Sequence, residues 1–150
     1  MKRKKWLIAV AAIVIIGLVI ASGWVPSYAS VLEKNWGISL PWQARLREVY
    51  EADLGPSFHG DGVRYHVFSY KYEDYIDLMF AWSSNEHETR HYDTVSQAAE
   101  AWLDEINVPA EERPDYDRCF SWNKSKSDNS EIIFFWDTEQ NLLYMVENFL

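Results

Sequence analysis

An uncharged and strongly apolar run near the start of the chain constrains this protein more than any other feature. The segment 6–25, WLIAVAAIVIIGLVIASGWV, contains 20 residues and no charged side chain. At about 1.5 Å per residue, a helix of this length spans roughly 30 Å, which is the thickness of the hydrocarbon core of a bilayer. The pattern therefore predicts a transmembrane helix that serves as a signal anchor.

The flanks of the apolar run predict its orientation. Four basic residues lie within segment 1–5, and the residues that directly follow the run are uncharged. Positively charged flanks stay on the cytoplasmic side of a membrane. We therefore expect a single-pass protein of the cell membrane, with residues 26–150 outside the cytoplasm. The alternative is a signal peptide that is cleaved near Ala29 and releases the same domain as a secreted protein.

The rest of the chain is acidic. It holds ten of the 14 Lys and Arg residues and all 23 Asp and Glu residues. Because such a surface repels phosphate backbones, nucleic-acid binding is not expected, whereas a protein or cell-envelope partner with basic groups is. The single cysteine, Cys119, excludes an intramolecular disulfide and is expected to be a small buried hydrophobe. The sequence predicts no cofactor.

The hydrophobic pattern after the apolar run predicts a tether over residues 26–39 and one α+β domain over residues 40–150. A 3.6-residue period predicts one helix over 41–52 and a second that begins at Thr94, where Thr94 and Gln97 have the spacing of a capping box. Apolar and aromatic runs predict about five strands in an antiparallel sheet. These strands are expected at 63–71, 76–82, 116–122, 131–136 and 141–148, with a helix as the alternative for 76–82 and a loop over 83–93.

Two motifs carry candidate chemistry. His87-Glu88-Thr89-Arg90-His91 matches H-E-x-x-H, which on a helix holds zinc through its two histidines and uses the glutamate as general base. The segment has no apolar stripe, and Arg90 would place a cation beside the metal, so a solvated loop is favoured over a zinc hydrolase. No metal site is favoured from the sequence.

The second motif is Phe58-His59-Gly60-Asp61-Gly62, whose glycines predict a tight turn. Phe58, His59 and Asp61 are the candidate binding residues, and the alternative is a structural turn that leads into the next strand. His66, on a strand face with aromatic neighbours, is interpreted as a hydrogen-bonded structural histidine. Most tryptophans are expected in the core, and any exposed ones would suit stacking on cell-wall sugars.

The FHGDG turn, together with Phe134–Asp137 and Asn141–Tyr144 as a C-terminal aromatic hairpin, resembles a group of uncharacterised small exported or membrane-anchored proteins of Gram-positive bacteria. The resemblance implies an extracytoplasmic bacterial location and no activity. The resulting hypothesis is a non-catalytic binding or interaction module. The alternatives are a zinc-dependent hydrolase that uses His87, Glu88 and His91, and a carbohydrate binder of the cell wall.

Overall fold

The computed structural model describes residues 28–53, 61–84 and 89–150. The chain divides into two compact units, residues 1–40 and 41–150. The described part of the first unit contains helix α2 (Tyr28–Trp36), so the predicted tether includes a helix. Gly37, with φ of +67°, follows this helix, and its N–H donates to the Glu33 carbonyl at 2.8 Å. A glycine at this position adopts the left-handed conformation without strain, which explains why the helix ends there.

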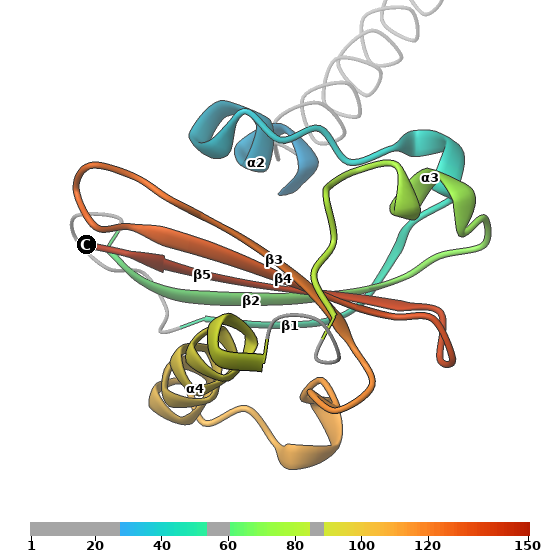
Figure 1. The fold of residues 1–150 in the computed structure, drawn as a ribbon. Helices are drawn as coiled ribbons and strands as arrows, with labels where there is room; N and C mark the ends of the chain where they lie inside the picture. The colour runs from blue at the N-terminus through green and yellow to red at the C-terminus, as the bar shows by residue number, and fades with distance from the viewer. Residues whose placement is uncertain (1–27, 54–60, 85–88) are drawn as a thin grey trace, which may run out of the picture. The chain divides into compact units, whose positions relative to one another are not determined.

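The second unit is built on a five-stranded sheet, shown in Figure 1. Its strands are β1 (Arg47–Asp53), β2 (Gly62–Ser69), β3 (Phe120–Ser125), β4 (Glu131–Asp137) and β5 (Leu142–Phe149). Their order across the sheet is β1-β2-β5-β4-β3, and every neighbouring pair is antiparallel. The described helices are α2, α3 (Asp74–Asp77) and α4 (Thr89–Glu105), with two short 3-10 turns, η1 (Trp42–Ala44) and η2 (Ala110–Glu112).

The strands at 63–71, 131–136 and 141–148 are confirmed within two residues, since their β-branched and aromatic side chains fill a pleated, buried surface. Polar side chains fix the β4–β5 turn, where Asp137 Oδ1 accepts N–H groups from Glu139 and Gln140 at 2.9 Å each. The strand predicted at 116–122 begins only at Phe120, because residues before it form a turn in which Arg118 and Cys119 donate N–H bonds to the Asp115 carbonyl.

Helix α4 packs its apolar stripe on one face of the sheet (Figure 1). Val95, Ala99 and Leu103 from the helix join inward residues of β2, β4 and β5 in a single core. The helix begins at Thr89 rather than at Thr94, so the predicted loop over 83–93 and the predicted cap are wrong in their bounds. The apolar period that predicts this helix begins at Val95, so the pattern does not indicate the helical turn before it.

Two predicted elements are replaced by others. The helix over 41–52 is wrong: η1 is followed by Arg45 in the left-handed conformation, with φ of +56°, and then by strand β1. The strand over 76–82 is also wrong, because α3 occupies its start and the chain then runs to Ser83, which forms a two-residue bridge with Ser121 of β3. In the first case pairing with β2, rather than the local periodicity, decides the structure. In the second case the helical alternative is correct for the start of the segment.

The predicted fold class and location need a correction. In residues 28–53, 61–84 and 89–150, no helix is both long enough and apolar enough to cross a bilayer. The structure therefore gives no support to a fold class with a transmembrane helix or to a single-pass location in the cell membrane. The predicted span 6–25 and its basic flank lie outside the described residues.

Candidate functional site

An irregularity in strand β1 brings two glutamates to the same face of the sheet. Glu48 pairs with Phe68 and Tyr50 pairs with Val67, so Val49 is an extra residue in the ladder. Residues three apart in a regular strand point to opposite faces, but one bulged residue between them restores the same face. As a result Glu48 and Glu51 both lie on the face that carries His66.

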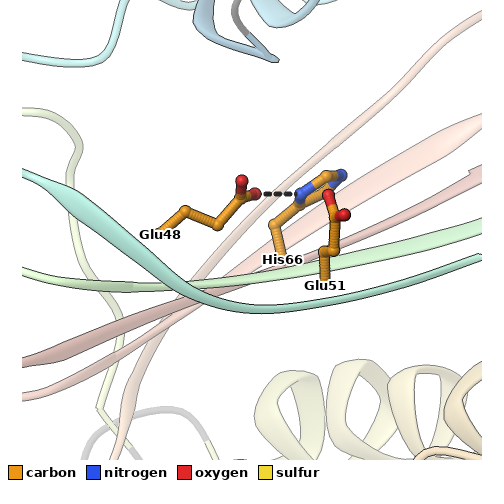
Figure 2. Close-up of side chains that lie close together, drawn as sticks. All are labelled: Glu48, Glu51 and His66. Carbon is orange, nitrogen blue, oxygen red and sulfur yellow. Dashed lines mark hydrogen bonds and ion pairs between the residues drawn. The ribbon is translucent and has the colours of Figure 1, made fainter.

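Figure 2 shows how the three side chains converge. Glu48 Oε1 lies 2.5 Å from His66 Nδ1, and Glu51 approaches the imidazole from its other side. One ligand atom from each of the three residues lies within 4.8 Å of the other two. The imidazole is buried, with 7 % of His66 exposed, and stacks on the Phe68 ring at 6.2 Å, whereas Glu48 and Glu51 are exposed. The buried imidazole of His66 thus lies between two exposed carboxylates, whose side chains can rotate.

Burial lowers the pKa of His66 below its ordinary value, since a buried imidazolium loses its hydration. The hydrogen bond to Glu48 and the charges of Glu48 and Glu51 oppose this shift, and the charge of Arg64 adds to it. His66 is therefore neutral at neutral pH, so its contact with Glu48 is a hydrogen bond rather than an ion pair. A carboxylate can only accept, so Nδ1–H is the donor and the ring lone pair is at Nε2.

A small pocket adjoins the cluster. Its volume is about 170 Å³, and among the described residues its lining consists of Glu51, Ala52, Asp53 and His66. Imidazole nitrogen and carboxylate oxygen are donors that suit divalent metal ions, and an acidic surrounding raises the local concentration of cations. The chemistry available here is the binding of a small cation rather than of a large organic ligand.

The site residues predicted from sequence fall largely outside the described part of the chain. Phe58, His59, His87 and Glu88 are not described. Asp61 is exposed and directly precedes Gly62, whose φ of +120° opens strand β2. His91 belongs to α4 by its backbone, and its side chain is not described. The FHGDG and HETRH hypotheses both stay predictions.

Cys119 is buried as expected, with 3 % exposed. Burial, together with the charges of Asp137 and Asp115, raises the pKa of its thiol. We therefore expect a thiol reagent such as dithionitrobenzoate to leave the native protein unmodified at pH 8 and to modify one thiol per chain in denaturant. Absorbance of the released thiolate measures this, and rapid modification of the native protein would contradict the burial.

Three tryptophans are packed into one aromatic cluster of the second unit. Trp122 stacks on Phe80 at 3.9 Å between ring centroids, and Trp82 lies 5.2 Å from Trp136. Trp136 is buried, as expected for a core residue, whereas Trp82 and Trp122 are half-buried and contact other rings. Trp42 differs, since 77 % of it is exposed. Sugar binding by exposed aromatic side chains stays a prediction.

The sequence does not reveal Glu48 and Glu51 as site residues, because its pattern predicts a helix over 41–52. The predicted hydrogen bond of His66 is confirmed, and its partner is Glu48. No local signal marks Val49 as a bulge, so the shared face of Glu48 and Glu51 is visible only in the paired strands. Comparison with protein-family models, with curated proteins and with solved structures found no match for this chain. The geometry of Glu48, Glu51 and His66 is therefore the basis for assigning a function.

Proposed function

We propose that this protein is a non-catalytic binding module that holds a divalent metal ion at Glu48, Glu51 and His66. The observation that carries the proposal is the convergence of their ligand atoms to within 4.8 Å beside a pocket lined by acidic groups. An imidazole with two carboxylates is a donor set that several divalent ions accept. The chain supplies the charge needed to balance such an ion.

The dimensions of the cluster support this proposal. Two ligands at about 2.1 Å from one ion are at most about 4.2 Å apart. The ligand atoms of the cluster lie within 4.8 Å of one another, and an exposed carboxylate such as that of Glu51 can approach an ion by rotating about its side-chain bonds. The pocket of about 170 Å³ is also smaller than the roughly 300–1,000 Å³ typical of sites for organic ligands, which favours an ion over a substrate.

Metal titration of the full chain tests the proposal. After removal of metals with a chelator, we expect one equivalent of a divalent ion to bind in equilibrium dialysis against Zn²⁺, Mn²⁺ or Ca²⁺, each used alone. His66→Ala removes the nitrogen ligand and should weaken binding at least about tenfold. Glu105→Gln removes an exposed carboxylate of α4 remote in sequence from the cluster, and should bind like the parent.

The double variant His87→Ala with His91→Ala separates this site from the H-E-x-x-H motif. The proposal requires this double variant to retain its metal ion and His66→Ala to lose it. The reverse pattern would favour the zinc-hydrolase hypothesis, and a chain that binds none of the three ions would refute the proposal. A macromolecular partner of the module stays a prediction.

A further inference from the structure

The direction of the hydrogen bond between Glu48 and His66 determines which imidazole nitrogen of His66 can bind an ion. Because a carboxylate accepts and Nδ1–H donates, the lone pair of the neutral imidazole is at Nε2. Histidines that bind metals commonly donate their other ring N–H to a carboxylate, which fixes the ring and raises the basicity of the ligating nitrogen. Glu48 occupies the place of that carboxylate.

The pocket beside the cluster brings Asp53 into the neighbourhood of Glu51 and His66. Its described lining contains Glu51, Asp53 and His66, whereas Glu48 is not part of it. Glu51 and Asp53 are two residues apart after the bulge, so they point to the same face of β1. Figure 2 shows Glu48 and Glu51 on opposite sides of the ring. A cation in the pocket would therefore meet Glu51, Asp53 and His66, while the Glu48 carboxylate is engaged by the hydrogen bond from His66 Nδ1.

The Arg64 guanidinium is a neighbouring positive charge that acts on His66. Arg64 lies two residues before His66 on β2 and pairs in register with Asp53 of β1. Its guanidinium lies 4.8 Å from the centroid of the Phe149 ring. Its positive charge opposes all divalent ions alike, so selection among them depends on the donor atoms. An imidazole nitrogen among the donors favours borderline transition-metal ions over hard ions that prefer oxygen alone.

We infer that the site selects a transition-metal ion such as Zn²⁺ over Ca²⁺ and Mg²⁺, with His66 Nε2, Glu51 and Asp53 as ligands and Glu48 as a positioning residue. This inference rests on the proposed metal-binding function. It assigns Asp53 a role that the three-residue cluster alone does not include, and it separates the two glutamates into different roles.

Selectivity is tested with the full chain that carries His87→Ala and His91→Ala, so that the H-E-x-x-H motif contributes no ion. Zn²⁺ is titrated with and without a large excess of Ca²⁺ or Mg²⁺. We expect the Zn²⁺ affinity to change less than threefold. Displacement of Zn²⁺ by either hard ion would overturn the inference and leave the proposed function standing, whereas binding of none of the ions would refute the proposed function.

The roles of the carboxylates are tested in the same background with Co²⁺, whose visible absorption band reports its ligands. Glu51→Gln and Asp53→Asn should each alter the band and weaken binding. Glu48→Ala should weaken binding by about 10- to 100-fold but leave the saturated band unchanged. Glu48→Gln retains an oxygen acceptor for Nδ1–H and should restore most of the affinity.

Glu105→Gln is the matched control and should leave affinity and band unchanged. A band altered by Glu48→Ala in the way that Glu51→Gln alters it would show that Glu48 is a ligand, which would overturn its assignment as a positioning residue. A parental band and affinity in Asp53→Asn would remove Asp53 from the ligand set. Both outcomes require that the chain binds the ion, so they differ from a failure of the proposed function.

Discussion

Replacement of Glu147 by glutamine should abolish most of the change in the free energy of unfolding between pH 6.5 and 8. Glu147 lies in β5 with 0 % of its surface exposed, and burial raises the pKa of its carboxyl from the ordinary 4.5 to about 8. The folded chain therefore holds a proton that the unfolded chain releases above pH 4.5. Stability from this group is complete below pH 4.5 and is lost as the pH rises to 8, by up to about 1.4 kcal/mol for each pH unit.

Most of the titration of the buried histidine lies below the chosen pH window. The pKa of His66 is lowered, so its linkage has the opposite sign and acts mainly below its ordinary value of 6.5. Urea unfolding of the parent, Glu147→Gln and the exposed control Glu105→Gln at pH 6.5, 7.2 and 8 measures the effect. The parent and the control should lose stability in parallel, and the glutamine variant should not. A parent with flat stability across this window would contradict a protonated Glu147 in the folded state.

The second large effect is expected at Phe135, in the middle of β4. Its ring is 1 % exposed, belongs to the core beneath α4, and meets the Tyr116 ring edge-on at 5.1 Å. Phe135→Ala removes this contact and leaves a cavity, so it should lower the free energy of unfolding by about 3–5 kcal/mol. That is a large fraction of the roughly 5–15 kcal/mol that holds a typical domain folded.

Denaturant unfolding monitored by circular dichroism measures the loss. Val49→Ala is the control, because the Val49 side chain is half exposed and its truncation should cost no more than about 0.5 kcal/mol. Phe135→Leu keeps most of the volume and should fall between the two. Equal stability of Phe135→Ala and Val49→Ala would show that the core is not packed around this ring.

The strands that could be predicted from sequence are those whose residues are buried on both faces. Six of the seven residues of β4 are buried, and a run such as Ile132–Trp136 has no stable alternative to the interior of a sheet. The period of α4 was equally informative where the helix packs, at Val95, Ala99 and Leu103. Before Val95 the segment has no such period, so the pattern does not predict the first turn of α4.

Strand β1 shows why the site could not be predicted. Trp42, Val49 and Tyr50 have helical spacing, and nothing in the segment indicates that β2 offers an unpaired edge. About five strands are predicted and the described residues contain five, but β1 is not among those predicted and 76–82 is not a strand. The relation of Glu48 to Glu51 depends on Val49 being skipped in a ladder, which is a property of two strands together.

The two edge strands of the sheet, β1 and β3, are protected in different ways against pairing with a strand of a second molecule. The outer edge of β3 is covered by the bridge between Ser83 and Ser121, whereas within the described residues no strand lies beyond β1. A kinked, charged edge strand resists lateral growth, because two such strands cannot align and their like charges repel. We therefore expect the charges of edge strand β1, at Glu48, Glu51 and Asp53, to oppose self-association through this edge. Acid, or a bound cation that neutralises them, would weaken this protection.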